Sequence, residues 1–166
     1  MTWITHTFFA FATSHILGLP VVPAVLGSTA PDWLEDVWGI REHRGITHYV
    51  LLWIGAFALA FFVWLWLRHD VFLHFLSFIY GGLTHIFLDS LTPSGVPVGV
   101  GKVRVRIGGL IRTGKLSEWV FLALVVFAFS PFLFSGVKLG WGTARELHEK
   151  GIIDKREYLE RRFKLW

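Results

Sequence analysis

The stretch GGLTHIFLDSLTPSG, residues 81–95, ends an apolar segment that runs from Val71 to Leu91 and is long enough to cross a bilayer. Within it, His85 and Asp89 are four residues apart, so on a helix both side chains lie on one face. Placing an ionisable side chain at membrane depth costs roughly 2.5 kcal/mol or more of free energy, so such a side chain rarely lies there without a partner or a function. A metal ion bound by both residues is one interpretation. A hydrogen-bonded pair that fixes helix packing is the alternative.

Two other segments have the length and apolar character of membrane spans. Residues 49–67 and residues 119–137 carry no charge, and a kink is expected at Pro131 because proline removes a backbone donor. Only residues 68–70 separate the span at 49–67 from the span at 71–91. These two spans should therefore form an antiparallel hairpin.

The first apolar segment, residues 3–28, has a different pattern. Gly18, Pro20 and Pro23 interrupt it. This predicts a broken or re-entrant segment rather than a plain span. The choice matters, because His6 approaches the later polar residues only if the segment turns back.

Composition supports a membrane protein. Of 166 residues, 54% are hydrophobic, 17% are aromatic and nine are Trp, which favours spans with interfacial aromatic belts. The absence of Cys excludes disulfides and thiolate ligands. The net charge of +4 comes from basic residues placed beside apolar spans, so an anionic lipid surface or a phosphate-bearing substrate explains it better than nucleic acid.

These patterns predict an all-α fold: a polytopic helical bundle, integral to the cell membrane, with three full spans and a broken N-terminal segment. Residues 1–137 would form the membrane-embedded domain, and residues 138–166 a short, charged, amphipathic helical tail. Between the second and third spans lies a Gly-rich loop, residues 92–116. Its alternation at 103–107 indicates a short β-hairpin.

A second group of polar residues precedes the span at 49–67. The sequence HRGITH, residues 43–48, places two imidazoles and a guanidinium together; imidazole suits zinc, and Arg binds phosphate oxygens. Interfacial contacts to lipid headgroups are the alternative. Asp32 could instead cap a short helix, and Glu118 could be an N-terminal helix charge. An up–down bundle brings all these loop ends to one membrane face, and that convergence favours a functional site.

The motifs HRGITH, His85-x-x-x-Asp89 and LTPSGVP, with the earlier Pro31-Asp32, resemble the membrane-bound, LexA-regulated metal-dependent hydrolases, the YdjM-like group. The resemblance covers residues 4 to about 130. The positions that carry over from the family's motifs are His6, Asp32, His43, Arg44, Thr47, His48, His85, Asp89, Thr92 and Glu118. More remotely, the ligand order is similar to that of bacterial zinc-dependent phospholipases C, which suggests a phosphoester substrate.

The chain departs from this family pattern at two places. The usual second Asp, two positions after the first, is Leu34 here, with Glu35 and Asp36 adjacent, and the Ser that usually follows HRGxTH is Tyr49. The first departure puts a complete second metal site in doubt. The tail is similar to a short C-terminal oligomerisation-type domain, which implies a homo-oligomer or a partner contact.

The resulting hypothesis is a membrane-embedded hydrolase that acts on a phospholipid or another lipid phosphoester. Its water would be activated by a divalent metal, expected to be one or two Zn²⁺ ions. The expected metal ligands are His6, Asp32, His43, His48, His85 and Asp89. The expected catalytic residues are Asp32, Glu118 and Arg44. The expected substrate-binding residues are Arg44, Arg104, Arg106, Arg112 and Thr92.

Two other functions are compatible with the same residues. In a non-catalytic scaffold or partner-binding module, the His and Asp pairs would only brace the bundle. In a small ion transporter they would line a pathway, although their clustering at one membrane face disfavours that.

Overall fold

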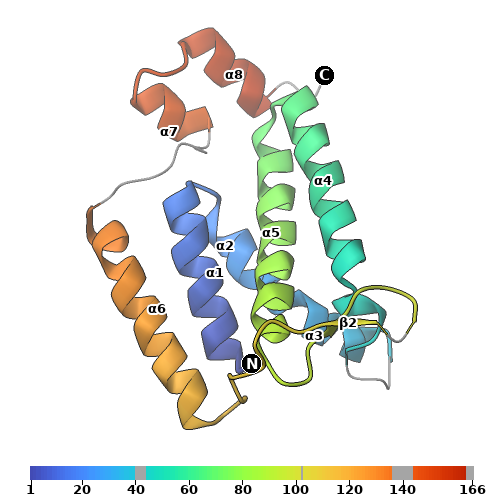
Figure 1. Cartoon of the computed structure of the whole chain (residues 1–166). Coiled ribbons are helices and arrows are strands. Elements are labelled where there is room, and N and C mark those ends of the chain that lie inside the picture. Colours follow the sequence, from blue (N-terminus) through green and yellow to red (C-terminus); the bar gives the residue numbers. More distant parts are fainter. Residues whose placement is uncertain (40–43, 102, 136–143, 164–166) are drawn as a thin grey trace.

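The computed structural model in Figure 1 describes residues 1–39, 44–101, 103–135 and 144–163. Its elements, in chain order, are α1 (Trp3–Leu17), α2 (Val21–Gly27), α3 (Ala30–Val37), a 3₁₀ turn η1 (Ile46–His48), α4 (Val50–Leu67), α5 (Asp70–Ser90), β1 (Val96–Pro97), β2 (Arg104–Val105), α6 (Leu116–Ser135), α7 (Ala144–Glu149) and α8 (Lys155–Phe163). The predicted all-α bundle is confirmed.

Three helices are long and apolar enough to cross a membrane: Val50–Leu67, Asp70–Ser90 and Leu116–Phe134. They match the three predicted spans to within a few residues. Half of the α5 span is buried inside the protein, whereas only 6% of the α4 span and 11% of the α6 span are buried. Helix α5 is therefore the centre of the bundle, and α4 and α6 present apolar side chains to the surrounding lipid.

The first apolar segment is broken, as its glycine and prolines predict. Helix α1 ends at Gly18, which adopts a left-handed φ of +74°, and the Leu19 N–H donates to Ser14 O at 2.9 Å. Helix α2 then begins after Pro20. Pro23 is tolerated in its first turn because an N–H there has no partner within the helix. The chain turns, and α2 packs against α1 and α5.

The short connection between α4 and α5 produces the expected hairpin, in which the two helices lie side by side (Figure 1). Helix α4 ends at Arg68, whose φ of +51° is left-handed. His69 begins the next helix, because its Nδ1 accepts from the Val71 N–H at 3.2 Å.

Glycines allow α2 and α5 to approach very closely. A Cβ at Gly81 would overlap Ala24 O, and a Cβ at Gly27 would overlap Phe78 O, so backbone packs directly on backbone. One turn before Gly81, the Ser77 hydroxyl donates to Pro20 O at 2.5 Å. Helix α2 is therefore held along its length against the middle turns of α5.

Gly82, the next residue, allows a similarly close contact between α5 and α4. A Cβ at Gly82 would overlap the indole ring of Trp53, which is buried in the core cluster with Ala30, Ile86 and Val96. Trp53 Nε1 donates to Thr47 O at 2.6 Å. This bond fixes the turn η1 beside α5.

The loop after α5 contains the predicted hairpin in a minimal form. Val96 pairs with Val105 and Pro97 with Arg104, in antiparallel register. The Ile107 N–H donates to Ser90 O at 2.7 Å, so the loop is fastened to the end of α5. In Figure 1 the N-terminus, α3 and this loop lie at the same end of the bundle.

Candidate metal centre

Five of the predicted ligands meet at this end of the bundle, and each is held by an element described above. His6 comes from α1, Asp32 from α3, His48 from η1, and His85 and Asp89 from the last turns of α5. All are buried except Asp32, whose side chain is 20% exposed. Asp32 therefore marks the side of the cluster that faces outward.

The first half of the cluster contains Asp32, His48 and His85. The two Nε2 atoms lie 3.3 Å apart, and Asp32 Oδ1 lies 3.4 Å from that of His48 and 3.5 Å from that of His85. These three atoms form a compact triangle, which is a geometry that could hold a metal ion.

The second half uses His85 again, with His6 and Asp89. His6 Nε2 lies 3.5 Å from Asp89 Oδ1, and His85 Nε2 lies 3.7 Å from Asp89 Oδ2. The rings of His6 and His85 are stacked, with centroids 3.9 Å apart. Although His6 is fully buried, neither of its ring nitrogens has a hydrogen bond of acceptable geometry. A buried imidazole without such a bond is costly, and a cation would satisfy it.

The Nδ1 atoms of two of the imidazoles already have hydrogen-bond acceptors. His85 Nδ1 donates to Ser28 O at 2.7 Å, and His48 Nδ1 donates to Glu35 Oε1 at 2.8 Å. In the neutral rings, this leaves the lone pairs on the two Nε2 atoms that face each other. Such second partners of a metal-ligating histidine fix its tautomer and its orientation.

Glu35 is a site residue that the sequence analysis missed as a functional group. Besides His48, its Oε1 accepts from the Gly45 N–H at 3.0 Å and from the Thr47 hydroxyl at 2.9 Å. The available signal was its position three residues after Asp32, on the same side of a short helix.

Arg44 is engaged within the cluster. Its Nη2 lies 2.9 Å from Asp89 Oδ2, and its Nη1 donates to Thr92 Oγ1 at 3.1 Å and to Gly95 O at 2.6 Å. The Met1 amino group lies 2.6 Å from Asp89 Oδ1. Arg44 therefore ties Asp89 to the loop that follows α5, and Thr92 takes part in the same contact.

Asp32 is ionised at neutral pH. Burial raises the pKa of its carboxyl, but the neighbouring imidazoles of His48 and His85 and the hydrogen bond from the Trp3 indole together outweigh burial and hold the pKa at about 2. The Trp3 bond runs from Nε1 to Asp32 Oδ2 at 2.9 Å. The carboxylate is thus available to a cation at neutral pH.

Glu118 lies outside both groups of potential ligands. Its Oε1 accepts from the Thr2 N–H, the Thr2 hydroxyl and the Thr5 hydroxyl at 2.6, 2.9 and 2.8 Å, and its Oε2 accepts from the Gly114 N–H at 2.6 Å. These bonds fasten the start of α6 to the start of α1. Its expected catalytic role stays a prediction.

Of the remaining predicted residues, Arg104 lies in β2, and Arg106 and Arg112 lie in the loop that follows it. The side chains of Arg104, Arg106 and Arg112 are exposed; Arg104 donates to Ser94 O at 3.1 Å and Arg106 to Pro93 O at 3.5 Å. His43 lies outside the described residues.

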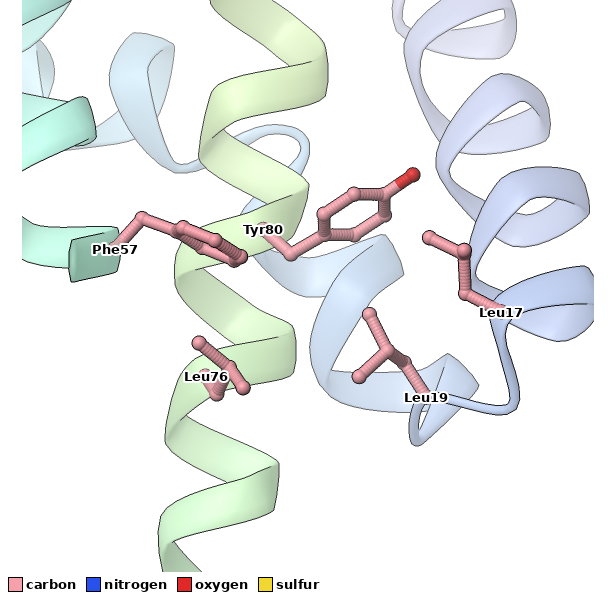
Figure 2. A pocket seen from close by; sticks show the side chains of 5 residues that line it. All are labelled: Leu17, Leu19, Phe57, Leu76 and Tyr80. Atoms are coloured by element: carbon pink, nitrogen blue, oxygen red, sulfur yellow. The ribbon is translucent and has the colours of Figure 1, made fainter. Parts of the chain in front are cut away.

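An apolar pocket lies elsewhere in the bundle and shares no residue with the cluster. Figure 2 shows its lining, contributed by Leu17, Leu19, Phe57, Leu76 and Tyr80. Leu76 is nine residues before His85, which is about 14 Å of helical rise and the opposite face of α5. The pocket is therefore separate from the His and Asp residues.

The donor set fits a divalent cation. Three imidazoles and two carboxylates converge at Nε2 and carboxylate oxygens, one imidazole has no hydrogen bond, and two others present lone pairs to each other.

Comparison with known proteins gives one match. The model of a family described as YdjM inner membrane protein matches residues 1–145. None of the curated proteins and none of the solved structures matches the chain. The remote likeness to zinc-dependent phospholipases C, expected from ligand order, has no support in these comparisons.

Proposed function

The chain belongs to the YdjM inner membrane protein family and is a multi-pass integral membrane protein, and on that premise we propose that it is a metal-dependent hydrolase. Its active site would be the buried His and Asp cluster at the end of α5. Its substrate would be a phospholipid or another lipid phosphoester.

The contact between His48 Nε2 and His85 Nε2 carries this proposal. Two imidazole nitrogens lie 3.3 Å apart while both Nδ1 atoms bond to acceptors. Two facing lone pairs repel, and a cation between them turns the repulsion into coordination. Asp32 Oδ1 completes the triangle with a negative charge.

His6, Asp32, His48, His85 and Asp89 would hold the cation, and their mixture of nitrogen and oxygen donors suits Zn²⁺. When bound, zinc would supply Lewis acidity, by polarising a phosphoryl oxygen and by lowering the pKa of a water molecule. Because the single Nε2 of His85 belongs to both triads, we expect one ion rather than two.

The chain's own residues would do the rest of the chemistry. Asp32 is the partly exposed ligand, and its carboxylate would accept a proton from an incoming water molecule. Arg44 would hold Asp89 in position. The exposed guanidinium groups of Arg104, Arg106 and Arg112 would attract the phosphate of the substrate.

The position of the cluster along the helices supports a lipid substrate. It lies in the last two turns of α5 and the first turns of α1. Exposed indoles surround the same end, from Trp3 on α1, Trp33 on α3 and Trp119 on α6. Tryptophan concentrates at the membrane–water boundary, so the cluster would lie at the depth of lipid headgroups.

Metal analysis and lipid hydrolysis on the same preparation test the proposal. We expect about one zinc ion per chain, and release of phosphorylated headgroup or phosphate from phospholipid vesicles that a chelator abolishes and zinc restores. His85→Ala should lose both the metal and the activity. His74→Ala is the matched control, because His74 is an exposed histidine of the same helix, and it should keep both.

The alternative function, a non-catalytic scaffold, predicts the opposite results. There, purified protein would contain no metal, and His85→Ala would change only its stability. Metal without hydrolysis of any lipid phosphoester would separate the metal centre from the proposed reaction and would contradict the hydrolase.

A further inference from the structure

The loop between α5 and α6 has an unusual surface for a polar connection. Val100 is 97% exposed, Leu110 is 81% exposed and Val103 is 70% exposed. The segment between Asp89 and Glu118 contains no acidic residue, and its basic residues are Lys102, Arg104, Arg106, Arg112 and Lys115. Exposed apolar side chains in a basic segment without acidic residues suit an anionic, partly apolar partner.

Basic and apolar side chains lie on opposite faces of the segment around the short strand β2. Side chains alternate along a strand, so Arg104 and Arg106 lie on one face, and both donate to carbonyls of the turn at residues 93–94. Val103, Val105 and Ile107 lie on the other face and are exposed. A strand that is cationic on one face and apolar on the other suits the boundary between headgroups and acyl chains.

The tip of the loop is attached to a membrane-spanning helix. The Leu51 N–H, in the first turn of α4, donates to Val98 O at 3.0 Å, and the Val98 N–H donates to Val103 O at 3.0 Å. Leu51 itself is exposed on the apolar surface of α4, which continues along that span. Val100, two residues beyond Val98, is therefore carried at the level where α4 enters the bilayer.

From these observations we infer that residues 98–101 and 103–110 form a lipid-binding surface that inserts Val100 and Leu110 among the headgroups of an anionic leaflet while Arg104 and Arg106 bind lipid phosphates. Polybasic segments are attracted to anionic leaflets over about a Debye length, and this attraction weakens with salt. The inference does not depend on the hydrolase proposal, since it concerns membrane attachment and not the metal.

Because the chain has no cysteine, single labels can test it in the full-length protein. Nitroxide labels at Val100→Cys and Leu110→Cys would be measured in phosphatidylcholine vesicles with and without phosphatidylglycerol. The readout is collision with a water-soluble nickel chelate. Leu59→Cys, exposed on the middle of α4, is the membrane control, and Lys155→Cys, exposed on α8, is the control outside the proposed surface.

With phosphatidylglycerol present, the Val100 and Leu110 labels should be several-fold less accessible to the chelate than the Lys155 label. Added salt, or Arg104→Gln together with Arg106→Gln, should restore their accessibility. Lys155→Gln together with Arg156→Gln removes the same charge from the tail and should leave it unchanged.

Three results would overturn the inference. The first is a Val100 label as accessible as the Lys155 label in both vesicle types. The second is equal protection without anionic lipid. The third is spin–spin broadening of the Val100 label that is lost on dilution with unlabelled protein, which would assign the surface to a second copy of the chain.

Discussion

Helix α5 carries a histidine toward each of its ends, and the two have opposite surroundings. His74 is exposed, and its Nδ1 contacts Asp70 O of its own helix at 2.7 Å. His85 is buried, contacts Ser28 O from another segment, and faces His48 Nε2. The two side chains have the same chemistry and the same helix, so the difference arises from what packs on each end. A histidine becomes a candidate ligand here because other elements surround it, and the predictions below test that difference in order of expected effect.

The largest expected effect is the link between metal and stability. At free Zn²⁺ a thousandfold above the dissociation constant, binding should stabilise the folded protein by about 4 kcal/mol. A chelator should therefore lower the thermal midpoint of wild type and of His74→Ala. His85→Ala should show no such difference, whatever its own stability. Equal chelator sensitivity in both variants would remove the distinction between the two histidines.

The next effect comes from the glycine contact that closes the site end of α5. In Gly81→Ala, the new Cβ would overlap Ala24 O, and backbone can move only at a cost of about 1–3 kcal/mol in unfolding free energy. Gly55→Ala on α4 is the control, because a Cβ there meets nothing within 4 Å. Thermal unfolding in detergent measures both. If Gly81→Ala were as stable as Gly55→Ala, the close approach of α2 and α5 would be wrong.

Glu35 should act through His48. Glu35→Ala removes the acceptor of His48 Nδ1 and should weaken metal affinity by about 10–100-fold, the usual effect of losing a partner of a ligating histidine. Glu35→Asp should recover part of it. The neighbouring Asp36 is exposed, so Asp36→Asn serves as the control and should bind zinc normally. A competition assay with a zinc-binding dye reports each affinity, and unchanged affinity in Glu35→Ala would exclude the positioning role.

The smallest expected effect is at the exposed edge of the site. Trp3→Phe removes the hydrogen bond from Nε1 to Asp32 Oδ2, so the carboxylate is held less firmly. We expect a loss of metal affinity of less than about tenfold, in line with one partly exposed hydrogen bond. Trp38→Phe, which changes an exposed indole at the end of α3, should show no loss in the same assay. A loss as large as that of Glu35→Ala would mean that Trp3 has a further role.

Sequence patterns predicted most of the fold because the relevant forces are local. Uncharged runs of sufficient length identify α4, α5 and α6, and the glycine and prolines near residue 20 identify the break after α1. The spacing of His85 and Asp89 identified one helix face. The loop-end positions in an up–down bundle, and then the resemblance to a family, pointed to His6, Asp32 and His48, which the structure places together with them.

Other features depend on contacts between segments that no local pattern contains. The position of Glu35 three residues after Asp32 places it on the same side of a helix, but it does not indicate that the Glu35 carboxylate accepts from His48. The residue type at position 28 likewise does not indicate that the Ser28 backbone carbonyl accepts from His85. The role of Arg44 in holding Asp89 rather than facing outward depends equally on tertiary packing. Each of these contacts joins segments that are separated in the chain.

By itself, then, the sequence determined where the chain crosses the membrane and which side chains are available to bind a cation, because hydropathy and spacing act within single segments. Only the tertiary structure decided that five of those side chains point at one another. The physical reason is that Gly27 on α2 and Gly81 on α5 let the two backbones come into direct contact, and that the Trp53 ring packs on Gly82. Without side chains at these points, α2 and η1 approach α5 closely enough for its last turns to be enclosed.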